Sequence, residues 1–460
     1  MKMLKKYFSD YNKAGGIKDL LAIAFPMMIS TACDGVMTFT DRLFLARVGS
    51  DQMNAAMGGG VSYQMLIFFF VGLTGYSTAL VAQYYGAGKW TNSSKAAFQV
   101  ILVTIVAWPV ILLIKPFIAS FFYTMNLPVG QVDFQVQYLN ILVWGGFFGM
   151  LRQTLSFYFT GIGKTKVVMI ATLTAMLVNV VLDYILIFGK FGFPVMGVRG
   201  AALATVAGGF AAMVILLIVY FGRFNRENFH VMKSFHFDWK IMKKLLHFGY
   251  PAGLEMLLNF IAFFFMIAMF QSRGESEATA TTIMFNWDLV SFIPLLGIEI
   301  AVTSLVGRYM GAGRPQAAHR TAYSAIKTGL FYSLVILILF LSIPEILVRL
   351  FHPHIPSDTF EKAVPIAISM IRLASLYVLA QAVTIAMIGT LRGAGDTFYT
   401  MILSVLANWT FLPLLYVCFY IFNLSVPFGW FIIVVVYLIF CFFIYRRFHS
   451  EKWKKIVVIR

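Results

Sequence analysis

The feature that most constrains this chain is a succession of long apolar segments that runs from one end of the sequence to the other. Hydrophobic residues make up 60% of the 460 residues and charged residues 12%, whereas soluble domains carry about 25% charged residues. An α-helix needs about 20 mostly apolar residues to cross a bilayer. The pattern predicts an all-α polytopic membrane protein with twelve transmembrane helices, centred near residues 28, 68, 107, 146, 177, 210, 257, 292, 336, 375, 409 and 435.

An internal repeat divides these helices into two sets. Residues 80–89 read L-V-A-Q-Y-Y-G-A-G-K and residues 305–314 read L-V-G-R-Y-M-G-A-G-R, an offset of 225 residues (305 − 80) that also carries Pro26 onto Pro251. Two landmarks in one register indicate a duplication. We predict two pseudo-symmetric six-helix lobes, residues 1–232 and 233–460, an organisation typical of transporters. The G-A-G turns predict sites where two helices approach closely.

The basic residues are distributed unequally between the two ends of the predicted helices. Both termini and the linker from Arg223 to Lys244 fall on one side with roughly 25 of the 36 Lys and Arg residues, and roughly 8 fall on the other. The N-terminal contribution includes Lys2, Lys5 and Lys6. The positive-inside rule then predicts a multi-pass plasma (inner) membrane protein with both termini in the cytoplasm. Because the net charge of +17 is not gathered in one patch, we expect no nucleic-acid partner.

Motifs for catalysis, metals or cofactors are not visible in the sequence. The three cysteines lie in apolar segments, and His352 and His354 form an isolated pair in a loop, which favours no metal site. No Gly-rich segment ends in the Gly-Lys-Ser/Thr of a phosphate-binding loop, so we do not expect ATP hydrolysis to supply the energy. We predict no cofactor and no enzymatic activity.

Acidic residues inside the apolar segments carry the informative chemistry. An ionisable group in a membrane helix costs several kcal/mol unless it faces a wet cavity or a partner, so function is the default hypothesis for each. Asp34 and Asp41 are two turns apart and share a helix face, and Asn179 lies one turn before Asp183. The acids within or at the edges of predicted spans are Asp34, Asp41, Asp183, Glu255, Asp288 and Glu299.

Several segments together resemble the multidrug and toxic compound extrusion (MATE) transporters. These are T-D-R-L-F-L-A-R-V-G (residues 40–49), N-V-V-L-D-Y-I-L-I-F-G (179–189), L-R-G-A-G-D-T (391–397) and the two repeated decamers, in the order and spacing of that family. The resemblance implies export of mostly cationic, amphiphilic compounds, driven by inward flow of Na⁺ or H⁺. The partners it implies are these small molecules and membrane lipids. With two lobes already in one chain, we expect a monomer.

Four residues of the N-terminal half match the cation-binding positions of that family: Asp41, Asn179, Asp183 and Thr205. Their chemistry agrees, because a hard cation prefers several oxygen ligands and this set supplies carboxylate, amide and hydroxyl oxygens. The same carboxylates are able to take a proton instead. The alternative is that Asn179 and Asp183 only tie neighbouring helices together by hydrogen bonds.

The C-terminal half departs from the family pattern. One branch uses a glutamate eight residues after the proline of the seventh helix, where this chain has Asn259, and Glu255 one turn earlier is a candidate substitute. Asp396 matches a further acidic position of that branch, or it caps the eleventh helix. Asp288 and Glu299 lie outside the transferable motifs. They share a helix face, and they either line the cavity or satisfy neighbouring groups.

Three other readings stay open at this point. A flippase for a lipid-linked precursor, from the same wider superfamily, shares the apolar repeats but needs extra spans and a basic cavity. A membrane-embedded enzyme needs a His or Cys constellation, and a channel needs a repeated filter segment. The sequence leaves open whether Na⁺ or H⁺ is the coupling ion, and which compound is the native substrate.

Overall fold

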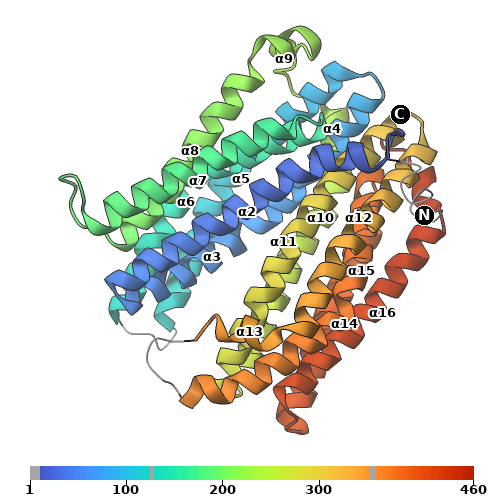
Figure 1. Cartoon of the computed structure of the whole chain (residues 1–460). Helices are drawn as coiled ribbons and strands as arrows, with labels where there is room; N and C mark the ends of the chain where they lie inside the picture. Colours follow the sequence, from blue (N-terminus) through green and yellow to red (C-terminus); the bar gives the residue numbers. More distant parts are fainter. Residues whose placement is uncertain (1–10, 125–128, 353–357, 460) are drawn as a thin grey trace. The chain divides into compact units, whose positions relative to one another are not determined.

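The structure is a computed structural model that describes residues 11–124, 129–352 and 358–459. Lys2, Lys5, Lys6 and His354 lie outside the described residues. Within these ranges the chain is helical throughout and contains no strand (Figure 1). The helices are α2 (Ile17–Val48), α3 (Ser50–Gly75), α4 (Ser77–Gly86), α5 (Trp90–Thr124), α6 (Val129–Gly161), α7 (Thr165–Phe188), α8 (Val198–Tyr220), α9 (Arg223–Asn228), α10 (Trp239–Gln271), α11 (Glu275–Gly311), α12 (Pro315–Ser342), α13 (Pro344–Arg349), α14 (Asp358–Ala394), α15 (Thr397–Tyr416) and α16 (Val426–His449), with the shorter η1 (Val231–Lys233), η2 (Val417–Ile421) and η3 (Lys452–Lys455).

The long helices confirm the predicted polytopic membrane fold. Eleven segments of the described chain are long and apolar enough to cross a membrane, counting α3 with α4 and α15 with η2 as one segment each. The twelfth long helix is α6, which packs against α3, α5 and α8. Its lower hydropathy follows from a run of polar side chains in its first half: Gln131, Asp133, Gln135, Gln137 and Asn140.

The position of the ninth span differs from its prediction. The sequence places its centre near residue 336, whereas α12 covers Pro315–Ser342 and is followed by the separate short helix α13. The first two turns of α12 are polar, which displaces the apolar run toward the end of the helix. Pro344 starts α13 at a position where its missing N–H costs nothing.

The described chain divides into two compact units. The N-terminal unit comprises Phe25–Leu254 and Gly307–Gly313, together with the last described residues, 458–459. The C-terminal unit comprises the described residues before Phe25, Glu255–Val306 and Arg314–Val457. Since the divisions fall inside α2, α10 and α11, the lobe boundary between residues 232 and 233 remains a prediction.

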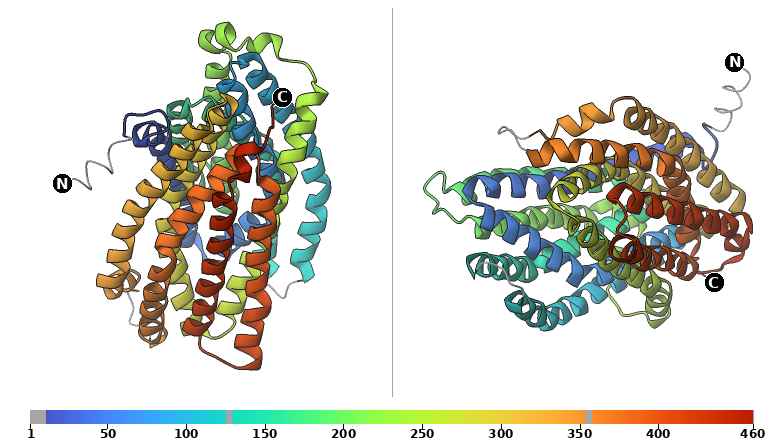
Figure 2. Two further views of the ribbon diagram at one scale, coloured as in Figure 1. Left: turned by 90° about the vertical axis from the view of Figure 1, so that its right-hand side faces the viewer. Right: turned by 90° about the horizontal axis from the view of Figure 1, so that it is seen from below.

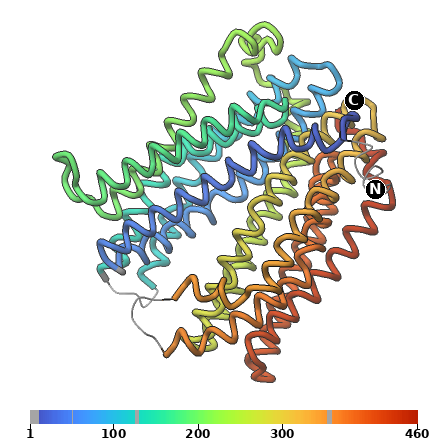
Figure 3. The backbone as a smooth tube through the Cα atoms, viewed as in Figure 1, coloured from blue at the N-terminus to red at the C-terminus, as the bar shows by residue number. Residues whose placement is uncertain are grey.

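Small residues on α8 bring the helices of the N-terminal unit close together. The helix packs against both α6 and α7, and Figure 3 shows α7 and α8 running alongside each other. A Cβ atom added to Gly208 would lie 2.7 Å from the carbonyl oxygen of Ala175, and one added to Gly200 would lie 2.8 Å from the carbonyl carbon of Leu186. Because real Cβ atoms essentially never approach so closely, these positions require glycine for the observed packing of α7 on α8.

The two copies of the repeated decamer meet each other within the N-terminal unit. A Cβ on Gly86 would lie 1.9 Å from the carbonyl oxygen of Arg308, and a Cβ on Gly311 would lie 2.0 Å from that of Gln83. The contact is reciprocal, because the offset of 225 residues carries Gly86 onto Gly311 and Gln83 onto Arg308. The prediction that the G-A-G segments mark a close approach of helices is therefore confirmed.

The core of the C-terminal unit contains several aromatic side chains that contact one another. Helix α14 packs between α12 and α16 in this unit, and α15 packs on α16 (Figure 2). Phe270 meets Phe419 edge to face at 5.2 Å between ring centroids, and Phe285 meets Trp430 at 5.4 Å. Edge-to-face pairs of this kind stabilise a core by about 0.5–1.5 kcal/mol beyond the area that they bury.

Candidate functional site

The four predicted cation-site residues lie together inside the N-terminal unit. Asp41 comes from α2, Asn179 and Asp183 from α7, and Thr205 from α8. Asn179 Nδ2 donates to Asp41 Oδ1 at 3.1 Å, and Thr205 Oγ1 donates to Asp41 Oδ2 at 3.0 Å. Both oxygens of Asp41 are thus occupied by neutral donors.

Asp183 differs from Asp41 in the hydrogen bonds that its carboxyl oxygens receive. It is 0% exposed, and neither of its carboxyl oxygens receives a hydrogen bond from a donor among the described residues. The amide oxygen of Asn179 is also buried without a donor. The Asp183 carboxyl interacts with that of Asp41. The pair Asp41–Asp183 therefore includes two carboxyl oxygens without a donor, and the amide oxygen of Asn179 also lacks one. No basic side chain among the described residues forms an ion pair with either carboxyl.

Tyr138 of α6 is a member of this group that the sequence did not reveal. Tyr138 is 6% exposed, and it lies within electrostatic range of Asp41 and Asp183. The residue packs in an apolar cluster with Leu45 and neighbouring side chains of α7 and α8. Nothing in the spacing of α6 marks Tyr138, because its partners belong to other helices.

Two buried carboxylates side by side are unstable as a pair of negative charges. Burial disfavours the charged form of each group, and the like charge of its neighbour adds to the penalty. A bound cation with oxygen ligands relieves both costs, and so does a proton on one carboxyl. The arrangement is therefore suited to exchanging a cation or a proton, and the hydrogen bonds of Asn179 and Thr205 hold Asp41 in place for it.

Asp34 does not join this group, although it shares a helix face with Asp41 in the sequence. Its side chain is 45% exposed and lies 3.5 Å from Nη1 of Arg152 on α6. Arg152 is more buried, with 16% of its side chain exposed. Asp34 therefore has a basic partner of its own, whereas Asp41 and Asp183 form no ion pair with a basic side chain in the described part of the chain.

In the C-terminal unit Glu255 and Glu299 share one arginine. Nη2 of Arg392 lies 2.9 Å from Oε1 of Glu255, and its Nη1 donates to Oε1 of Glu299. The glutamates are 2% and 8% exposed. Arg392 belongs to the L-R-G-A-G-D-T segment, but its pairing with α10 and α11 has no signal in the sequence.

The remaining C-terminal candidates each have a separate partner. Asn259 Nδ2 donates to Ser404 Oγ at 2.8 Å, and Asp288 accepts a hydrogen bond from the hydroxyl of Tyr377. Asp288 and Glu299 both face α14, as their common helix face predicts. Whether any of these residues takes part in transport stays a prediction.

The interpretation of Asp396 as a helix cap is wrong. The residue occupies the N-cap position of α15, but its side chain makes no capping hydrogen bond. Instead it accepts two hydrogen bonds from Arg447 of α16, at 2.7 Å from Nε and 3.1 Å from Nη2. A paired guanidinium is a stronger partner for a buried carboxylate than backbone N–H groups, which explains the difference.

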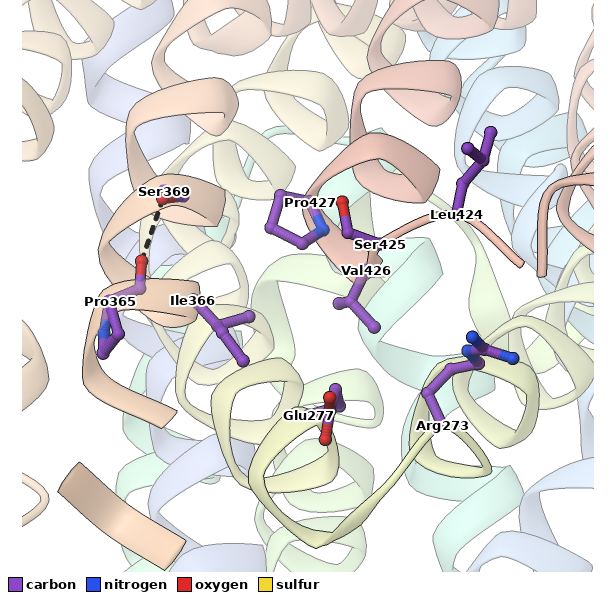
Figure 4. Close-up of a pocket in the computed structure, with 9 residues that line it drawn as sticks. All are labelled: Arg273, Glu277, Pro365, Ile366, Ser369, Leu424, Ser425, Val426 and Pro427. Carbon is purple, nitrogen blue, oxygen red and sulfur yellow. Dashed lines mark hydrogen bonds between the residues drawn. The ribbon is translucent and has the colours of Figure 1, made fainter. Parts of the chain in front are cut away.

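A separate pocket of about 310 Å³ opens in the C-terminal unit, at the start of α11 and the turn before α16 (Figure 4). None of its lining residues is a predicted site residue. Arg273 at its edge is bound to the carbonyl oxygen of Phe419 and to Asn423. The other lining residues are Glu277, Pro365, Ile366, Ser369, Leu424, Ser425, Val426 and Pro427.

Comparison with known families decides the class of protein. The MatE family model matches this chain twice, over residues 26–185 and 251–417. The chain belongs to the MATE family. The two matches begin at the two prolines that the repeat places in register, so the duplication extends over most of both halves. As a MATE protein, the chain is a multi-pass membrane transporter.

Curated relatives and solved structures agree with this assignment. The probable multidrug resistance protein NorM of Thermotoga maritima is 28% identical over 452 residues, which cover 96% of this chain and 94% of that protein. The multidrug resistance protein MdtK of Yersinia pestis is 26% identical over 85% of both. A MOP-superfamily transporter from Pyrococcus furiosus shares the fold, with a TM-score of 0.85 at 20% identity over 95% of both chains. An outward-facing multidrug resistance MATE transporter has a TM-score of 0.85 at 19% identity, covering 95% of this chain and 96% of that one.

Proposed function

We propose that this MATE protein is a secondary active antiporter that exports cationic, amphiphilic compounds from the cytoplasm in exchange for Na⁺ or H⁺. The names of its curated relatives support drug extrusion. The proposed coupling mechanism rests on the hydrogen bonding of two side chains of α7, Asn179 and Asp183. Within the described ranges, the carboxyl of Asp183 and the amide oxygen of Asn179 are buried and receive no hydrogen bond, whereas both oxygens of the neighbouring Asp41 accept one.

Coupling follows from the position of these groups on three helices. A cation held between Asp41 and Asp183 attracts α2 and α7 toward the same point, whereas the ion-free pair repels. The ion therefore binds the two arrangements with different affinity, which is the requirement for shifting a conformational equilibrium. Binding of the ion is expected to favour release of the exported cation, so that the two cross the membrane in opposite directions.

The orientation in the membrane belongs to the same proposal. The excess of basic residues on the side of both termini and of the linker supports a plasma (inner) membrane protein with these segments in the cytoplasm. Tags at residues 1, 230 and 460 are then protected from an impermeant reagent in intact cells. Labelling of any one of them from outside would contradict the orientation.

The function is tested with purified protein in proteoliposomes that contain ethidium. Sodium and proton gradients are imposed separately, and dye movement is recorded for the wild type, Asp183→Asn and Asp133→Asn. Asp133 is an exposed carboxylate of α6 and serves as the matched control. We expect the wild type and Asp133→Asn to move ethidium under at least one gradient, and Asp183→Asn to show only the background leak.

Two results contradict the proposal. Well-folded Asp183→Asn that transports at the wild-type rate would exclude the N-terminal carboxylates as the coupling site. Gradient-independent movement of a lipid-linked precursor, with no movement of ethidium, would favour the flippase alternative.

A further inference from the structure

The two glutamates of the C-terminal unit differ from the acids of the N-terminal unit in having a cation of their own. Arg392 reaches Glu255 and Glu299 with the two Nη nitrogens of a single guanidinium group. Glu255 and Glu299 belong to α10 and α11, and Arg392 to α14. Among the described residues, only the neutral side chains of Asn179 and Thr205 donate to Asp41, and no side chain donates to Asp183.

The repeat shows which residues correspond to these three charges in the N-terminal half. The offset of 225 residues carries Ser30 onto Glu255 and Thr74 onto Glu299. The segments G-I-G-K-T (161–165) and G-A-G-D-T (393–397) give an offset of 232 (393 − 161), which carries Thr160 onto Arg392. In the N-terminal half all three positions thus hold neutral hydroxyl residues.

Each of those three hydroxyl groups donates to a backbone carbonyl oxygen of its own helix, and the hydroxyl of Thr160 also lies 3.7 Å from Sδ of Met27 on α2. Ser30 donates to the carbonyl oxygen of Pro26, Thr74 to that of Phe70 and Thr160 to that of Ser156. All three residues are buried. The fold therefore does not require charges at these positions, and the glutamates and the arginine of the other half have another reason to occur as a set.

The C-terminal half, in turn, has apolar residues at the positions that correspond to the proposed coupling site of the N-terminal half. The same offsets carry Asp41 onto Met266, Asn179 onto Phe411 and Asp183 onto Leu415. These residues are 6%, 6% and 0% exposed and belong to the apolar core of the C-terminal unit. The C-terminal half therefore has no copy of the proposed coupling site, and its own acidic pair is at a different place.

We propose that Arg392 is a built-in counter-cation that occupies the carboxylate pair Glu255–Glu299, so that the C-terminal unit does not bind the coupling ion. This inference rests on the proposed function of Asp41 and Asp183, and it makes the N-terminal unit the single ion site of the transporter. In this role Arg392 determines ion specificity and stoichiometry, because it takes the place that a free cation would fill.

The chemistry of a guanidinium group suits this role. It stays charged at every physiological pH and its planar fork binds two carboxylate oxygens at fixed positions. A tethered cation also has a high effective concentration at its partners, so a free monovalent ion has to displace it at a disadvantage. The ionised trio keeps a net charge of −1, and 31% of the Arg392 side chain is exposed, which allows water to screen the remainder.

The test measures stabilisation of the purified, full-length transporter by Na⁺ as a shift in melting temperature. The variant Asp183→Asn removes the N-terminal site, and its shift is expected to fall to the level of a choline chloride control. Adding Arg392→Gln frees Glu255 and Glu299. The double variant Asp183→Asn/Arg392→Gln is expected to regain a Na⁺-dependent shift, and adding Glu299→Gln to it is expected to abolish that shift again.

A matched control is Asp183→Asn/Arg447→Gln. Arg447 also pairs with a buried carboxylate, but with a single one, Asp396. Its removal is expected to produce no Na⁺-dependent shift, because one carboxylate is a poor cation site. A shift in this control equal to that of the Arg392→Gln variant would mean that any unpaired acid gives the effect, and it would overturn the inference.

Two further outcomes overturn the proposal. The first is a folded Asp183→Asn/Arg392→Gln that shows no Na⁺-dependent shift. The second is an Asp183→Asn protein whose Na⁺-dependent shift persists and disappears on Glu255→Gln, since the trio then binds the ion with Arg392 in place. If the wild type shows no Na⁺ dependence, the proposed coupling by Na⁺ fails, and Arg392→Gln alone still tests the inference.

A second measurement keeps the proposal open to refutation if Arg392→Gln does not fold. Glu255→Gln leaves one glutamate for one arginine, so the trio becomes neutral and retains an ion pair. This single variant is expected to keep the full wild-type Na⁺ shift. A loss of half of the shift or more in a folded Glu255→Gln protein would show that Glu255 is an ion ligand.

Discussion

Replacing Asp183 by asparagine should make the ion-free transporter more stable while removing its response to cations. The side chain keeps its size and loses its charge, and one of its two acceptor oxygens becomes an NH₂ donor. Asp41, whose carboxyl interacts with that of Asp183, then faces a donor in place of a second negative charge. The two effects have opposite signs, which separates a coupling residue from a structural one.

The magnitude follows from the burial of the group. Asp183 is 0% exposed and its oxygens have no donor among the described residues. A buried polar group without a partner costs about 1–3 kcal/mol, and a charged one costs more. We therefore expect ion-free Asp183→Asn to gain about 1–3 kcal/mol in free energy of unfolding. The wild type alone should gain about 2.7 kcal/mol from an ion at 100 times its Kd.

Thermal unfolding of the detergent-solubilised protein measures both effects. Melting temperatures are compared at one scan rate, because unfolding of a membrane protein of this size is not assumed to be reversible. The series runs from sodium-free buffer to saturating sodium at several pH values. Low pH matters because a proton shared by Asp41 and Asp183 also removes one negative charge, which reduces the stability that Asp183→Asn gains over the wild type. Asp133→Asn should follow the wild type throughout. A lower melting temperature of ion-free Asp183→Asn, with its sodium response intact, would refute the reasoning and assign Asp183 a purely structural role.

Other substitutions test neighbouring parts of the argument. Asn179→Ala and Thr205→Ala each remove one hydrogen bond to Asp41, so sodium affinity should fall by about 0.5–1.5 kcal/mol. Titration of the melting temperature with sodium measures this loss of affinity. The control Thr172→Ala should show no change, because the Thr172 hydroxyl donates to the carbonyl oxygen of Val168 in its own helix. Gly86→Ala places a Cβ 1.9 Å from the Arg308 carbonyl oxygen and should destabilise by about 1–3 kcal/mol or prevent folding. Gly130, the second residue of α6, has nothing within 4 Å of an added Cβ, so Gly130→Ala should leave the melting temperature close to that of the wild type. Equal melting temperatures of the two alanine variants would contradict the close approach at Gly86.

Most of the fold was predictable because a membrane helix carries its signal locally. Apolar runs of sufficient length mark eleven of the long segments. The apolar run centred near residue 146 marks α6, although the first half of that helix is polar. The misplaced centre of α12 has the same physical origin. Hydropathy reports where a segment is apolar, whereas the helix also includes a polar first part that begins at Pro315.

The polar groups of the N-terminal and C-terminal units differed in how far the sequence could predict them. Asn179 and Asp183 are one helical turn apart, so their common position on α7 was readable directly. Arg392 is separated by 93 residues from Glu299, and no periodicity connects them. Tyr138 was missed for the same reason. Contacts between helices depend on the tertiary fold, and only a family motif or a structure reveals them.

The duplication gives the clearest physical argument about coupling in this transporter. Two halves with a common origin have a similar backbone, but their charges are at different positions of that backbone. At the ion-site positions of the N-terminal half, the C-terminal half has Met266, Phe411 and Leu415. Where the C-terminal half has Glu255, Glu299 and Arg392, the N-terminal half has hydroxyl residues. An unpaired acidic group changes its energy when an ion enters or leaves, whereas a paired group changes much less. If Asp41 and Asp183 form the proposed coupling site, the energy of the N-terminal half depends on the ion gradient, whereas the paired charges of the C-terminal half contribute a nearly constant energy.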